Sequence, residues 1–213
     1  MGCFAKGCLT LLIIGFILLG GMIGGTWYLC QKAADKLTSS EPVDLLLVPP
    51  DDAQVRTAER SVTRVKTAIA TRQETTVVFT AADLNALVDR DPGFSKVRGR
   101  MRIDIANSVM TITMSAPLDD FFWSRLKRRW FNASAAFSFA YAFGMFRFDI
   151  RSAEANGHQL PDEFLSSFVS SFNESFNRSF QRKLRENRGA EFWEHVKTMS
   201  LEGDKLVVTT QAE

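Results

Sequence analysis

A run of phenylalanines at intervals of four residues constrains the fold of this chain more than any other feature. The run begins after Leu160-Pro161-Asp162, and its rings are Phe164, Phe168, Phe172, Phe176 and Phe180, with Leu184 continuing the spacing. This spacing predicts a helix in which each step of four residues rotates the side chain by about 40°. Over six positions the stripe winds roughly 200° around the helix, whereas a helix on a flat sheet buries a stripe of about 100°.

Two interpretations of this winding stripe follow. In the first, a strongly curved sheet wraps the helix and the rings are core, each stabilising the fold by roughly 1.5–3 kcal/mol when fully buried. In the second, sheet and helix enclose an apolar groove for a lipid tail, lined by Phe164, Phe168, Phe172, Phe176 and Phe180. Both interpretations predict a long Phe-rich helix packed against a curved sheet.

Alternation of apolar and polar residues predicts that this sheet is antiparallel. Residues 97–105 and 110–116 alternate on either side of Asn107-Ser108, which is typical of a hairpin with one wet face. Residues 131–150 also alternate, and their phase changes at Gly144, which predicts a bulge or a bend between two long strands. Residues 196–210 predict a last hairpin. The class that these patterns favour is α+β.

Two more helices are predicted ahead of the strands. Apolar residues at positions 55, 58, 62, 65 and 69, after a capping Asp51, follow the spacing of a helix. The pattern spans only two heptads, so docking on the domain is favoured over a short dimer stalk. Thr80-Ala-Ala-Asp83 resembles a capping box and predicts a short helix that ends near Asp91-Pro92-Gly93.

The N-terminal segment predicts a membrane anchor. Residues 8–29 carry no charge and end in Trp27-Tyr28-Leu29, and a helix of this length reaches about 33 Å, enough to cross a bilayer. A cleaved signal peptide would have a shorter apolar region and small residues at its end. We therefore expect an anchor at 1–30, a linker at 31–50 and one domain at 51–213, with the domain on the extracytoplasmic side of the cell membrane.

Two further segments predict contacts at this membrane. Gly20 and Gly24 have the spacing at which two membrane helices approach closely, so a homodimer is possible. Four basic residues lie among aromatic ones and suit either a membrane surface or a loop beside a core-edge tryptophan; they are Arg125, Lys127, Arg128 and Arg129.

Charge and motif content exclude several functions. The 26 basic and 24 acidic residues leave a net charge of +2, which gives no support to nucleic acid as a partner. Phosphate-loop, dinucleotide, hydrolase-elbow and zinc-ligand motifs are missing from the sequence. All three cysteines lie in or beside the predicted anchor, and only two histidines are present. We therefore expect no enzyme activity, no cofactor and no metal site.

One motif carries a family resemblance. Phe79-Thr80-x-x-Asp83-Leu84-Asn85-Ala86-Leu87 follows a single predicted span and precedes a hairpin, long strands, a helix and a last hairpin. This order resembles that of bacterial anchored extracytoplasmic proteins of the YpmS-like kind, and it is similar to the LmeA-like mannan-maturation proteins, which are thought to handle lipids. The resemblance implies a non-enzymatic, lipid-contacting domain and carries over no catalytic residues.

These observations predict an anchored domain that binds a lipid or another apolar ligand at the cell envelope. The alternative is a structural or interaction subunit of a membrane complex. That subunit would assemble through the membrane helix and the predicted helix at 55–69.

Overall fold

The structure, a computed structural model of the chain, describes residues 36–90, 98–119, 127–186 and 190–212. The predicted span at 8–29, with Gly20 and Gly24, lies outside these ranges, as does Arg125. Within the described ranges, no helix is long and apolar enough to cross a membrane.

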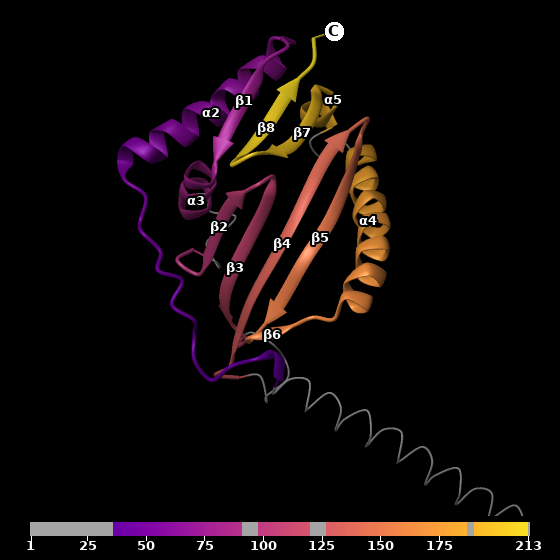
Figure 1. The fold of residues 1–213 in the computed structure, drawn as a ribbon. Helices are drawn as coiled ribbons and strands as arrows, with labels where there is room; N and C mark the ends of the chain where they lie inside the picture. Colours follow the sequence, from indigo (N-terminus) through magenta and orange to yellow (C-terminus); the bar gives the residue numbers. More distant parts are fainter. Residues whose placement is uncertain (1–35, 91–97, 120–126, 187–189, 213) are drawn as a thin grey trace, which may run out of the picture.

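Eight strands form one antiparallel sheet, and the fold class is α+β (Figure 1). The strand order is β1-β8-β7-β4-β3-β2, and β5 pairs with the other edge of β4 and with the short β6. The strands are β1 (Thr76–Thr80), β2 (Met101–Ala106), β3 (Val109–Pro117), β4 (Trp130–Ala142), β5 (Met145–Ala155), β6 (His158–Gln159), β7 (Val196–Glu202) and β8 (Lys205–Thr210). β3 and β7 share one edge of β4: β3 pairs with residues 130–137 of β4, and β7 pairs with residues 140–142.

The helices lie at two sides of this sheet. They are α2 (Asp52–Ala70), α3 (Ala81–Arg90), α4 (Asp162–Arg185) and the short α5 (Ala190–Glu194). In Figure 1, α2 and α3 lie beside β1 and β2, whereas α4 runs along the opposite side, next to β5. The predicted Phe-rich helix at 164–184 is therefore present.

The first two helices begin as their sequences predict. The backbone N–H of Gln54 donates to the side chain of Asp51 at 2.7 Å, which caps α2. At α3 the N–H of Asp83 donates to the Thr80 hydroxyl at 3.1 Å, and the N–H of Thr80 donates to the Asp83 carboxylate at 2.9 Å. The capping box is confirmed, with aspartate in the place of the usual glutamate.

The apolar face of α2 is used inside the domain. Val65 and Ile69 pack into the main core with residues of β1, β7 and β8, and Val55 and Ala58 pack against Ala86 of α3. The stripe at 55–69 therefore docks on its own domain, as predicted. A dimer stalk would need this same apolar face of α2, which the rest of the domain already covers.

The connection between the two long strands differs from the prediction. β4 and β5 form a hairpin in which Ala142 pairs with Met145, so Phe143 and Gly144 alone make the turn. The apolar phase changes at Gly144 because two residues leave the ladder there, not because of a bulge or bend. The bulge lies inside the pair instead, between Ala136 and Phe137.

The first predicted hairpin also starts later than its sequence pattern. β2 begins at Met101, because Gly99 adopts a positive φ of 67° in a turn. Gly tolerates this conformation and ends the extended run there.

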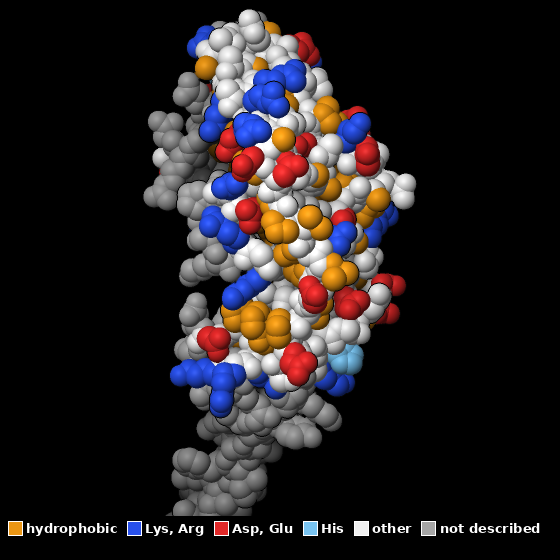
Figure 2. Space-filling view, turned by 90° about the vertical axis from the view of Figure 1, so that its left-hand side faces the viewer, with side chains coloured by type: hydrophobic (Ala, Val, Ile, Leu, Met, Phe, Trp, Pro, Cys, Tyr) orange, Lys and Arg blue, Asp and Glu red, His pale blue; other side chains and the backbone are white. Residues whose placement is uncertain are grey.

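The side of the molecule that carries α2 and the 41–50 segment has mixed character. Figure 2 shows basic and acidic side chains interspersed there among small apolar patches. Leu46 and Val48 are exposed on that segment, at 75% and 88%. Neither positive nor negative charge therefore predominates on this side of the molecule.

Candidate functional site

Side-chain amides attach α4 to the outer edge of β5. The backbone N–H of Phe148 donates to Oδ1 of Asn173 at 2.7 Å, and Nδ2 of Asn173 donates to the Phe148 carbonyl at 2.8 Å. Asn177 makes the same pair of bonds with Phe146, at 2.8 and 2.7 Å. Gln181 extends the series by donating to the Gly144 carbonyl at 2.7 Å.

The spacing of these amides follows from helix and strand geometry. Four helical residues rise about 6 Å, and two strand residues span about 6.6 Å. One amide in every helical turn therefore meets every second strand residue. In the sequence each amide directly follows a phenylalanine, at Phe172-Asn173, Phe176-Asn177 and Phe180-Gln181. Phenylalanines and amides thus form two parallel stripes, and the helix lies along a strand edge.

The stripe of rings fills the angle between α4 and the sheet. Phe172 and Phe176 lie 5.3 and 4.9 Å from the ring of Phe148, centroid to centroid. Phe180 lies 5.2 Å from Phe146 and, across a perpendicular contact, 5.2 Å from Trp193. These contacts are typical of packed aromatic side chains, and the three rings of α4 are half-buried.

This packing bears on the predicted ligand lining. None of the three cavities described in this section and below is lined by Phe172, Phe176 or Phe180. The side chains of Phe164 and Phe168 lie outside the described residues. A lipid-lining role for the stripe stays a prediction, and the core interpretation accounts for the contacts observed.

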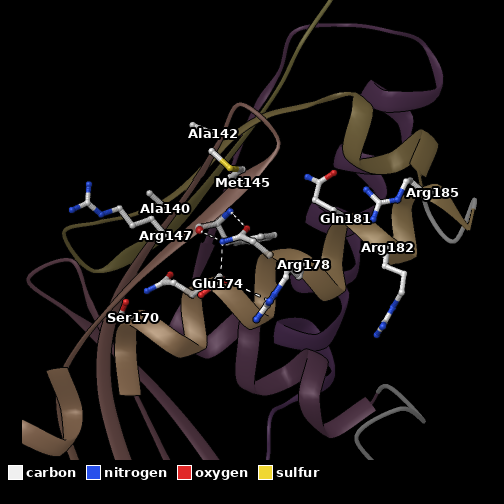
Figure 3. Close-up of a pocket in the computed structure, with 13 residues that line it drawn as sticks. Ala140, Ala142, Met145, Arg147, Ser170, Glu174, Arg178, Gln181, Arg182 and Arg185 are labelled. Carbon is white, nitrogen blue, oxygen red and sulfur yellow. Dashed lines mark hydrogen bonds and ion pairs between the residues drawn. The ribbon is translucent and has the colours of Figure 1, made fainter. Parts of the chain in front are cut away.

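A basic groove of about 1210 Å³ lies on the other side of α4, over the outer face of β4 and β5. Figure 3 shows Arg147 projecting from the strand, and Arg178, Arg182 and Arg185 from the helix. Glu174 forms an ion pair of 3.4 Å with Arg178. Among the described residues, no carboxylate lies within ion-pair distance of the other three arginines. The groove is therefore positively charged.

An apolar cavity of about 210 Å³ lies between α2, α3, α5 and the sheet. Its lining is apolar except for Lys66, and consists of Val62, Val65, Lys66, Phe79, Leu84, Leu87, Phe192, Met199, Leu206 and Val208. Leu84 and Leu87 belong to the Phe79–Leu87 motif on which the family resemblance rests. The sequence shows them as one helix face, but it does not show that a cavity faces them.

The predicted membrane-surface residues lie where the chain from residues 1–35 joins the domain. Ser39 forms a bridge with Trp130, at the start of β4. Arg129 donates to the Thr38 carbonyl at 2.8 Å, so its guanidinium holds this junction. Lys127 and Arg128 are exposed beside it. The structure therefore brings Lys127, Arg128 and Arg129 together, with one of the three in a structural role.

Other chemistry-bearing groups have structural partners. The guanidinium of Arg102 pairs with Asp104 at 2.9 Å, and that of Arg100 lies 5.3 Å from the Trp130 ring. Tyr141 is buried and donates to the Trp193 carbonyl at 3.2 Å, and this burial raises the pKa of its phenol. In the described part of the chain, no cluster of three or more His, Cys, Asp or Glu residues is arranged to hold a metal.

Comparison of the chain with protein-family models, with curated proteins and with solved structures finds no match.

Proposed function

We propose that this chain is a membrane-anchored, non-catalytic domain that binds the acyl chain of a lipid, or a similar slender apolar ligand. The observation that carries the proposal is the apolar cavity under α2 and α3. An apolar lining favours an apolar ligand, because binding removes apolar surface of both from water. The resemblance of the Phe79–Leu87 motif to lipid-handling proteins points to the same class of ligand.

The size and the rim of the cavity narrow the ligand. At about 210 Å³ it is smaller than the 300–1,000 Å³ typical of sites that enclose a whole drug-sized molecule. It therefore suits one acyl chain, with the headgroup left outside. Lys66 is exposed beside this lining and offers an ammonium group to a carboxylate or phosphate headgroup.

The anchor in this proposal is the uncharged segment 8–29, with the domain on the extracytoplasmic side. Its support is the length and composition of that segment. The exposed Lys127 and Arg128 lie at the same end of the domain as residue 39. In this proposal, that end of the domain faces the bilayer that holds the anchor.

A photoactivatable fatty acid tests the cavity in the full chain reconstituted into nanodiscs. We expect crosslinks to peptides of α2, α3, β7 and β8, located by mass spectrometry. Leu84→Trp replaces a leucine of the lining by a larger side chain that occupies part of the cavity. The labelling should fall about tenfold, the loss of affinity expected when the ligand loses about one to two kcal/mol of apolar burial. Val78→Trp on the exposed side of β1 is the matched control and should label as the wild type does.

Labelling confined to residues 1–30, or labelling that Leu84→Trp leaves unchanged, would remove the cavity as the binding site. Thermal unfolding of each variant separates blocked binding from a misfolded domain.

A further inference from the structure

The tip of the β4–β5 hairpin has an exposed phenylalanine ring in a backbone conformation, positive φ, that phenylalanine rarely adopts. Phe143 and Gly144 form the two-residue turn, with φ of 53° and 76°. The side chain of Phe143 is 99% exposed, and that of the next residue but one, Met145, is 59% exposed. A bulky residue at positive φ is an outlier in folded proteins.

Two other turns of the same chain provide an internal comparison. Asn107-Ser108 and Asn156-Gly157 also connect neighbouring strands with both residues at positive φ. Asparagine stands first in each, as type I′ hairpin turns prefer, whereas Phe143 holds that place in the β4–β5 turn. Neither the turn conformation nor core packing accounts for the phenylalanine, so its ring points to an external contact.

Positive charge lies along one side of this tip. Met145 lines the basic groove together with Arg147, Arg182 and Arg185 (Figure 3). On its other side, Phe143 lines a hollow of about 660 Å³ with Lys197 and Glu194. Lys197 pairs with Glu74 at 2.9 Å, so the excess charge comes from the arginines.

We propose that the β4–β5 tip inserts Phe143 into an anionic lipid surface, with Arg147, Arg182 and Arg185 facing the headgroups. Two exposed side chains bury far less area than a stable protein interface needs. A single aromatic ring, by contrast, suits the boundary between headgroups and acyl chains. Each arginine near an anionic surface strengthens binding by about fivefold.

The place of the tip determines which surface it meets. β4 has 13 residues and spans about 43 Å, and the Ser39–Trp130 bridge lies at its other end. The tip therefore points away from the junction with residues 1–35. If the anchor of the proposed function is correct, the tip reaches a second lipid surface, and the domain bridges two membranes.

Vesicle capture tests this inference with the full chain. The protein is reconstituted into phosphatidylcholine vesicles, and outward orientation of the domain is checked by protease accessibility. Fluorescent vesicles with or without phosphatidylglycerol are then added. We expect capture of the vesicles that contain phosphatidylglycerol, weaker at high salt, and little capture of neutral ones.

Phe143→Asn is the decisive variant, because it removes the ring and creates the preferred turn sequence. Capture should fall about tenfold, the value for losing one inserted aromatic side chain, while the unfolding temperature rises. Replacing both Arg182 and Arg185 by glutamine should also weaken capture. The same change at Arg56 and Arg64, exposed on α2, is the control and should leave capture unchanged.

Three results would overturn the inference: no capture by the wild type, equal capture of neutral vesicles, or full capture by Phe143→Asn. The fatty-acid labelling experiment reports on the cavity alone, so the two proposals fail separately. Should residues 8–29 not insert, cosedimentation of the chain with anionic vesicles tests the tip directly.

Discussion

Asparagine side chains replace a neighbouring strand at two edges of this sheet. Asn173 and Asn177 pair with β5, and Asn85 of α3 does the same with β2. The N–H of Ile103 donates to Oδ1 of Asn85 at 2.9 Å, and Nδ2 of Asn85 donates to the Ile103 carbonyl at 2.7 Å. An amide side chain presents a donor and an acceptor side by side, as one residue of a neighbouring strand does, so it satisfies both backbone groups of one edge residue.

This pairing predicts a specific loss for Asn177→Asp. A carboxylate can accept from the Phe146 N–H, but it cannot donate to the Phe146 carbonyl and repels it. We expect the free energy of unfolding to fall by about 1–3 kcal/mol in urea denaturation, since a largely buried acceptor loses its donor. Ser175→Ala, exposed on the same helix, is the control. Equal stability of both variants would show that the amide pair contributes nothing net.

The buried phenol of Tyr141 predicts a dependence of stability on alkaline pH. Burial raises its pKa above the usual value of 10.0 in the folded state. The folded state therefore holds its proton more tightly than the unfolded state does. That stabilisation is complete below pH about 10 and is lost as the pH rises through the folded pKa. The unfolding midpoint should fall more steeply above that pH in the wild type than in Tyr141→Phe. Parallel profiles for the two proteins would contradict this.

Single residues that act locally are the part of this structure that the sequence predicts best. Asp51 caps α2, and Thr80 together with Asp83 caps α3, because each partner lies three residues away. In the sequence, Asn173 and Asn177 are polar positions within the predicted Phe-rich helix. Their partners lie 25 and 31 residues away, on a strand, so no local pattern indicates the contact.

At the scale of elements, periodicity predicted the type of each element better than its place in the fold. The stripe at 55–69 and the alternation at 131–150 gave α2, β4 and β5. The turn at Phe143-Gly144 was not predicted, because phenylalanine is not a turn residue and the phase change alone also fits a bulge.

The long helix shows the same limit more clearly. Its winding stripe favoured either a curved sheet or an open groove, and both interpretations placed the helix on a sheet face. In the structure α4 lies along an edge, where rings cover one side of β5 and amides bond to its backbone. A stripe of residues four apart is inclined by about 26° to the helix axis, so a strand that follows it crosses the helix at that angle.

At the scale of the whole molecule, the first and last strands pair with each other at one edge of the sheet. β1 pairs only with β8 among the described strands, and β8 lies between β1 and β7. The Thr210 hydroxyl accepts from the Thr75 N–H at 3.0 Å and donates to the Gln73 carbonyl at 2.7 Å. The chain is therefore joined near both ends of the domain.

Truncation after Asp204 should abolish cooperative folding. It removes β8 with the buried Leu206 and Val208, leaves Val77 and Phe79 of β1 without a sheet, and opens the apolar cavity. The truncated protein should show no thermal transition by circular dichroism. Removal of Ala212 and Glu213 alone, which keeps the bonds of Gln211 to His195 and Glu194, should leave the transition in place. A cooperative transition in the longer truncation would contradict the central role of β8.

The pairing of β1 with β8 also sets a waiting time during synthesis. About 125 residues separate the two strands, and at 5–20 residues per second a ribosome needs roughly 6 to 25 seconds to make them. Throughout that time Val77 and Phe79 have no strand to cover them, although the segment at 8–29 has already been made. If the proposed anchor at 8–29 inserts, the nascent chain would reach a membrane well before its domain closes, with the first strand open to chaperones until the last one emerges.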